Sequence, residues 1–168
     1  MIDDIPLHIL GAITILLTNT VTAQPVHVDY EAINRPGLEI HKPEHPAKRP
    51  IREYLSDYGV THDIDDYVDD LVDVSSRYGV DPRIIVAIYV LESSAGRYCY
   101  RFNCYGWAGG SVGFGSHREA LEAVGETIAK YKARGVVKTQ DIMSVWRTGG
   151  LNDSSEYPSK AMKIIQSI

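Results

Sequence analysis

The chain has 168 residues, of which 44% are hydrophobic and 23% are charged, and its formal net charge at pH 7 is −5. These values are ordinary for a soluble globular protein and supply enough apolar residues for one buried core. They speak against a nucleic-acid-binding protein, because such a protein usually carries a dense basic stripe that this sequence lacks.

The amino terminus has the pattern of a signal peptide, over residues 1–23. No Asp, Glu, Lys or Arg occurs in residues 5–28, and residues 9–17 form a short apolar core. This core is shorter than the roughly 20 apolar residues of a membrane-spanning helix, and the Val-Thr-Ala segment that follows it suits cleavage. Asp3 and Asp4 stand where a basic segment is usual, so a weak membrane anchor is the alternative. We expect an exported protein, in the periplasm, the cell envelope or outside the cell.

Residues 24–52 are expected to form an extended linker. They contain five of the eight prolines of the chain and show little apolar periodicity, a combination that is typical of linkers. A segment with so little apolar surface is not expected to contribute to a core. The folded domain is therefore expected to comprise residues 53–168.

About five helices are predicted after the linker. Asp63 can cap a first helix, whose apolar residues follow helical spacing up to Tyr78. Asp81 followed by Pro82 can open a second helix, which is expected to stop near Gly96. No convincing run of alternating strand residues is present, so the fold class is mainly α. The other predicted helices begin at a capping box at residues 116–119, at Thr139, and near Asp153 or Glu156.

Seven aspartates crowd between Asp57 and Asp73, a stretch that contains no Lys or Arg. Such a cluster could suggest calcium, but the spacing of a calcium-binding loop is absent. A solvated helix face is the favoured interpretation. We expect neither a metal nor a cofactor.

A lone carboxylate, Glu92, stands in the otherwise apolar and aromatic stretch 87–107. It lies four residues after Ile88, beside the apolar stripe of its helix and in the last turn. Apolar neighbours and the negative end of the helix dipole both disfavour an ionised carboxylate. A carboxylic acid that keeps its proton can protonate a leaving group, as the general acid of a glycosidase does. The alternative is a structural Glu92 paired with Arg97 or Arg101.

Three motifs in this region follow one another in a specific order. They are Glu-Ser-Ser-Ala-Gly at 92–96, Asn-Cys-Tyr-Gly-Trp at 103–107 and Phe-Gly-Ser-His-Arg-Glu-Ala at 114–120. Together they resemble the lysozyme-like superfamily, and more closely its bacterial and phage branch of glucosaminidases and lytic transglycosylases, which cleave peptidoglycan. The resemblance covers about residues 58–168. It implies a lysozyme-like fold, with Glu92 as the catalytic acid at the end of a buried helix.

The resemblance also implies a sugar cleft lined by the loop after the catalytic carboxylate. Asn103, Tyr105 and Trp107 are the expected substrate-binding residues of this loop, although relatives often have Trp or Phe where this chain has Tyr105. Many relatives place a Tyr after the third helix, where it assists the catalytic Glu. This chain has Trp146 in that segment, so either Trp146 takes the role or the role is lost. Tyr157, a little downstream, is the fallback candidate.

A second carboxylate suited to direct displacement is not evident, since Glu119 and Glu122 belong to a capped helix and look structural. With one acid, the substrate's own N-acetyl group or its 6-hydroxyl can attack the anomeric carbon. A substrate-assisted glucosaminidase and a lytic transglycosylase are therefore both open. The expected partners are glycan strands of peptidoglycan, and the protein is expected to be a monomer. The rival is a non-catalytic cell-wall-binding or virion structural module, in which Glu92 only organises the loop.

The two cysteines, Cys99 and Cys104, have four residues between them. Two thiols are too few for a zinc site. In an exported protein we expect a disulfide, which closes a small loop and stiffens the wall of the cleft. Free buried thiols are the alternative.

Overall fold

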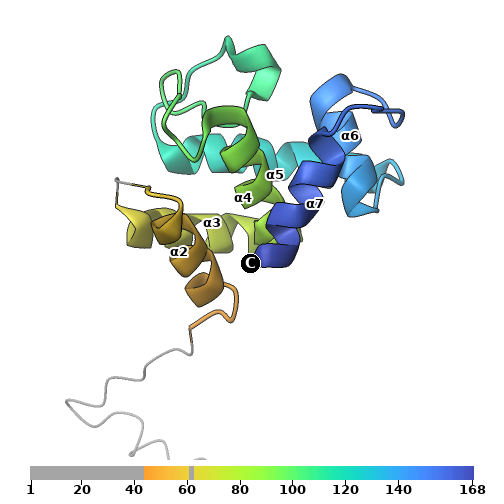
Figure 1. Cartoon of the computed structure of the whole chain (residues 1–168). Coiled ribbons are helices and arrows are strands. Elements are labelled where there is room, and N and C mark those ends of the chain that lie inside the picture. The colour runs from red at the N-terminus through yellow and green to blue at the C-terminus, as the bar shows by residue number, and fades with distance from the viewer. Residues whose placement is uncertain (1–43, 61–62) are drawn as a thin grey trace, which may run out of the picture. The chain divides into compact units, whose positions relative to one another are not determined.

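A computed structural model describes residues 44–60 and 63–168. The predicted signal segment and most of the predicted linker lie outside these residues. The described part of the chain is a mainly α domain with six α-helices and no sheet (Figure 1). None of these helices is long and apolar enough to span a bilayer. They are α2 (Lys48–Asp57), α3 (Ile64–Tyr78), α4 (Pro82–Ser93), α5 (His117–Ala133), α6 (Thr139–Thr148) and α7 (Tyr157–Ser167), with the short 3-10 turn η1 (Trp107–Gly110).

The predicted starts of α3, α4 and α5 are confirmed by their caps. Asp63, Asp81 and Ser116 each accept a hydrogen bond, through a side-chain oxygen, from a backbone N–H two or three residues later. Such a bond satisfies one of the N–H groups that a helix start leaves without a partner. In the capping box of α5, Glu119 accepts from the N–H of Gly115 at 2.7 Å, which fixes the loop that precedes this helix.

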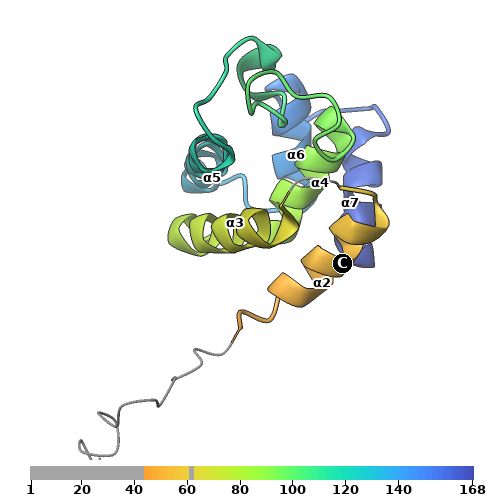
Figure 2. The same ribbon diagram turned by 90° about the vertical axis from the view of Figure 1, so that its left-hand side faces the viewer.

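The helix α4 is buried on nearly all of its sides. Its residues from Ile84 to Val90 are each at most 6% exposed, as expected of a helix that is apolar all round. It packs against α3 and α7 and lies between them in both ribbon views (Figure 1, Figure 2). The helix ends at Ser93, three residues before the expected Gly96, because Ser94 adopts a left-handed conformation with φ 52°. The end of α4 therefore brings Glu92 from the core to its edge.

The predicted boundary between linker and domain, at residues 52 and 53, falls inside α2. This helix begins at Lys48, and its residues Ile51 and Leu55 have no exposed surface. Pro50 lies in the first turn, where the N–H that proline lacks would have no helical partner. The prolines made the segment look like a linker, but the apolar residues of α2 pack against α3. The domain therefore starts before residue 53.

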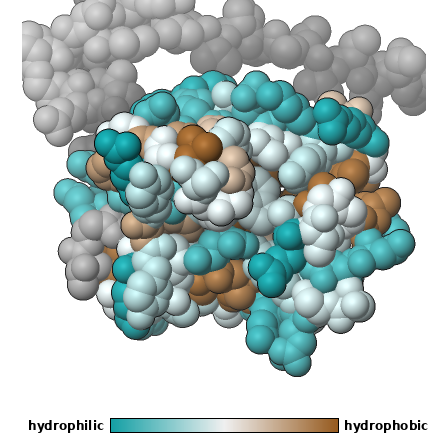
Figure 3. Space-filling model, turned by 90° about the horizontal axis from the view of Figure 1, so that it is seen from above, coloured by the Kyte–Doolittle hydropathy of each residue, from teal (hydrophilic) through white to brown (hydrophobic). Residues whose placement is uncertain are grey.

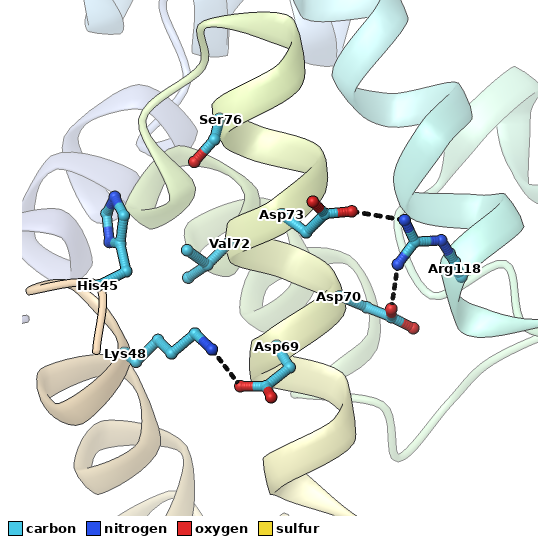
Figure 4. A pocket seen from close by; sticks show the side chains of 8 residues that line it. All are labelled: His45, Lys48, Asp69, Asp70, Val72, Asp73, Ser76 and Arg118. Atoms are coloured by element: carbon cyan, nitrogen blue, oxygen red, sulfur yellow. Dashed lines mark hydrogen bonds and ion pairs between the residues drawn. The ribbon is translucent and has the colours of Figure 1, made fainter. Parts of the chain in front are cut away.

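Ion pairs connect α3 to the helices on either side of it. Lys48 of α2 pairs with Asp69 at 2.7 Å, and Arg118 of α5 bonds to both Asp70 and Asp73 (Figure 4). We call these five residues the α3 face. The aspartates that were expected only to face solvent also form ion pairs, and these pairs connect α3 to α2 and to α5. The described residues contain no group of three or more His, Cys, Asp or Glu side chains placed to hold a metal ion.

Candidate active site

Glu92 and Tyr157 meet where α4 ends and α7 begins. The phenol of Tyr157 donates a hydrogen bond of 2.6 Å to Oε1 of Glu92, and both side chains are half-buried. Burial, and after it the hydrogen bond to Glu92, raise the pKa of Tyr157 far above its usual range. The phenol therefore keeps its proton and remains a donor to the carboxyl group. Of the two candidates for an assisting residue, the structure brings Tyr157 to Glu92.

The segment before α7 fixes the position of Tyr157. Its backbone N–H donates to Oγ of Ser155 at 3.2 Å, and the N–H of Ser155 donates to Oδ1 of Asp153 at 2.8 Å. Hydrogen bonds from Ser155 also hold the pKa of Asp153 below its usual range. On the other side, the guanidinium carbon of Arg147 lies 5.5 Å from the centroid of the Tyr157 ring. Contacts from α6 and from its own loop thus orient the ring.

Gly106 lies directly against the carboxyl group of Glu92. A Cβ atom at this position would be 2.9 Å from Cδ of Glu92 and closer still to its Oε2. Gly106 also has a φ of 65°, in the left-handed region that other residues rarely adopt. The glycine of the Asn-Cys-Tyr-Gly-Trp motif is thus required both by its backbone conformation and by the space that Glu92 occupies.

Asn103 holds the loop together from inside. Its Nδ2 donates to the carbonyl oxygens of Trp107 and Val112, at 2.9 and 2.8 Å. Its Oδ1 accepts from the backbone N–H of Trp107 at 3.2 Å, and the residue is 4% exposed. These bonds use both ends of the amide and shape the turn that places Gly106. In this geometry both ends of the amide bond to the loop itself. The contact of Asn103 with a sugar stays a prediction.

The three aromatic candidates other than Tyr157 have different surroundings. Tyr105 has no exposed surface, and its hydroxyl lies 3.0 Å from that of Tyr67 in the core. Trp107 and Trp146 are half-buried and line a cavity of about 270 Å³ together with Gly106. Trp146 also donates from Nε1 to the carbonyl oxygen of Tyr105 at 3.2 Å. Of the three, the two tryptophans are open to a ligand, and the predicted sugar contact of Tyr105 would need the loop to open.

Glu92 lines a cavity of about 400 Å³, which we call the Glu92 pocket. Two cations in its wall, Arg147 and Lys160, were not anticipated from the sequence. The sequence offers one local signal for Lys160: it lies one helical turn after Tyr157, on the same face of the helix. Arg147 directly follows Trp146, and this spacing does not place the two on one face. The pocket is lined by Leu91, Glu92, Arg147, Ser155, Glu156, Tyr157 and Lys160.

The predicted disulfide between Cys99 and Cys104 is confirmed. The closed loop carries two exposed aromatic side chains, Tyr100 at 54% and Phe102 at 42%, and Tyr98, just before the loop, is 71% exposed. On the face seen from above, hydrophobic residues form separate patches among hydrophilic ones rather than one continuous area (Figure 3).

No family model, no curated protein and no solved structure matches the chain. The function is therefore argued from the site and from the order of the motifs that form it.

Proposed function

We propose that the chain is a peptidoglycan-cleaving glycosidase that acts on β-1,4 bonds between N-acetylglucosamine and N-acetylmuramic acid, with Glu92 as its general acid. The observation that carries the proposal is the 2.6 Å hydrogen bond from Tyr157 to Glu92 at the wall of an open pocket. It joins a carboxyl group and a phenol that lie 65 residues apart in the chain. The motif resemblance implies Glu92 as the catalytic acid, and it leaves Tyr157 as the fallback for the assisting tyrosine of the family.

The two oxygens of Glu92 have different tasks in this proposal. Oε1 accepts from the Tyr157 phenol, which leaves Oε2 to carry the proton. As the glycosidic bond breaks, the proton passes from Oε2 to the departing sugar oxygen, and Glu92 becomes a carboxylate. The phenol, which keeps its own proton, stabilises that new charge through a charge-assisted hydrogen bond. Tyr157 therefore favours the state of Glu92 that follows proton transfer.

The anomeric carbon needs a nucleophile from the opposite side. The lining of the Glu92 pocket contains one other carboxylate, Glu156, which pairs with Lys160 at 2.9 Å. We therefore assign the attack to the substrate itself. Attack by the N-acetyl oxygen gives a cyclic intermediate, which water or the 6-hydroxyl of the same sugar then opens from the other face while the Glu92 carboxylate takes up the proton of that second nucleophile. Water gives a reducing sugar end, and the 6-hydroxyl gives an anhydro sugar. Both routes use Glu92 in the same way, and the mass of the released sugar end distinguishes them.

The test is cleavage of purified sacculi by the full-length protein, followed by turbidity and by mass spectrometry of the released fragments. Glu92→Gln keeps the shape of the side chain but has no acidic proton, so activity should fall at least ~100-fold. Tyr157→Phe removes one hydrogen bond to a charged group, and a loss of roughly tenfold is expected. Glu126→Gln and Tyr58→Phe make the same chemical changes at exposed positions outside the pocket and should leave activity unchanged.

The alternative, a non-catalytic module that binds cell walls, gives a different result in the same assay. In that case the wild type binds sacculi but releases no soluble fragment, and Glu92→Gln does not alter binding. The hydrogen bond between Glu92 and Tyr157 would then be only a connection between α4 and α7. Cleavage that persists in Glu92→Gln would instead show that another group is the acid.

A further inference from the structure

Arg147 is an exposed cation held in a fixed place beside the catalytic carboxyl group. It lies in the last turn of α6, and its guanidinium stacks over the ring of Tyr157 with 5.5 Å between guanidinium carbon and ring centroid. It lines the same pocket as Glu92. Stacking on an aromatic face restricts a guanidinium without using its N–H donors. The donors of Arg147 are therefore oriented while remaining available to a ligand.

The carboxylates near Arg147 do not form an ion pair with it. Glu156 pairs with Lys160 at 2.9 Å, and Oδ1 of Asp153 accepts from the N–H of Ser155 at 2.8 Å, while Oδ2 of Asp153 is buried without a hydrogen-bond partner among the described residues. Within the described part of the chain, Arg147 forms no ion pair, whereas Arg118 on the α3 face bonds to two aspartates. Asp153 still attracts Arg147 from a greater distance, since Arg147 helps to lower the pKa of Asp153. This attraction involves no hydrogen bond, so it leaves the donors of Arg147 unused.

We propose that Arg147 is a specificity residue of the Glu92 pocket that binds a carboxylate of the substrate strand next to the cleaved bond. This inference rests on the proposed function and deepens it. A guanidinium and a carboxylate match in shape and can form two parallel hydrogen bonds. Peptidoglycan offers such a group from two sources: the lactyl ether of N-acetylmuramic acid, whose carboxylate is free where the peptide has been removed, and the acidic residues of the stem peptide.

The test measures equilibrium binding of glycan fragments of equal length to full-length Glu92→Gln, which should not turn them over. Three fragments separate the sources: peptide-free muramyl glycan, peptide-bearing muramyl glycan, and chito-oligosaccharide, which has no carboxylate. Adding Arg147→Gln should weaken binding of one or both muramyl fragments by about tenfold, the effect of losing a charged hydrogen bond. Binding of the neutral fragment should not change. The matched control is Arg134→Gln, which removes the same charge from an exposed position at the end of α5.

The fragment that weakens identifies the source of the carboxylate. An equal loss for all three fragments would show that Arg147 only orients Tyr157, and no loss for any of them would show that it does not contact the strand. Either result overturns the inference while cleavage of sacculi by the wild type still supports the proposed function. If the wild type cleaves nothing but the loss is confined to muramyl fragments, the carboxylate site stands and the proposed activity fails.

Discussion

The α3 face and the Glu92 pocket both gather charged side chains and both contain ion pairs, but Glu92 and Arg147 of the pocket lie outside such pairs among the described residues. On the α3 face, Asp69 and Asp73 each lie within ion-pair distance of a cation from a neighbouring helix. In the pocket, Glu92 accepts a hydrogen bond from a phenol and does not pair with a cation of the described part of the chain. Arg147 stacks on the ring of Tyr157 and does not pair with a carboxylate there. Groups that satisfy one another hold helices together. Groups that are oriented but not neutralised remain available to a ligand.

The contrast extends to how each region is built. The α3 face uses exposed or half-buried side chains on the surfaces of helices, and ion pairs of this kind contribute little to stability. The pocket depends on close packing, because Gly106 leaves no space for a methyl group beside Glu92. Changes in the pocket should therefore affect activity strongly, and changes on the α3 face should affect stability weakly. Three variants test this comparison, in order of expected effect.

Gly106→Ala should have the largest effect of the three. The added methyl group would meet the Glu92 carboxyl group, so either the loop or the carboxyl must move away from the position that Tyr157 fixes. A misplaced catalytic group loses about 100-fold in rate, and sacculus cleavage should fall accordingly.

Gly109→Ala is the matched control for this change. Gly109 has a φ of 68°, almost the same as the 65° of Gly106, but a Cβ atom there would meet nothing within 4 Å. Both variants therefore carry the same backbone strain, and only one of them affects Glu92. Equal loss of activity in the two variants would mean that strain in the loop, and not contact with the carboxyl group, is responsible.

Cys99→Ser should have an intermediate effect, mainly on stability. The disulfide closes a loop of small size, for which the unfolding free energy is expected to fall by about 2 kcal/mol when it is lost. Denaturant unfolding with and without reductant measures this change. On reduction, the unfolding free energy of the wild type should fall toward that of Cys99→Ser, and that of the variant should not change. A native wild-type protein that alkylates readily before reduction would show that the bridge is not formed.

Much of the fold could be predicted because its signals are local. The caps at Asp63, Asp81 and Ser116 mark helix starts by side-chain chemistry within three residues, and the structure confirms them. The start of α2 differs from the expected domain boundary because Pro50, which is typical of a linker, is also tolerated in the first turn of a helix. The apolar spacing of Ile51 and Leu55 was the available signal.

The site was only partly predictable, because its contacts join distant parts of the chain. Glu92 was identified from its helix, but its bond to Tyr157 spans 65 residues and depends on how α7 packs against α4. The stacking of Arg147 on that ring follows from the packing of α6 against α7, which no local pattern encodes. Asn103 was identified as important, yet whether its amide faces the sugar or the loop depends on the turn that it forms.

Arg118→Gln should have the smallest effect, and it should depend on pH. Hydrogen bonds from Arg118, and then from Arg77, lower the pKa of Asp73, so the folded state favours the ionised form. This contribution is present above the ordinary aspartate pKa of about 3.9 and is lost as pH falls through the lower value of the folded protein. At pH 7 the variant should be slightly less stable than the wild type, and below about pH 4 the two should converge. Thermal unfolding across this range measures the difference, which high salt should also reduce.

Arg134→Gln, which removes an arginine without an ion pair among the described residues, controls for net charge. A loss in Arg118→Gln as large as that of Cys99→Ser would mean that the α3 face holds the domain together as strongly as the disulfide, and the contrast between the two regions would fail.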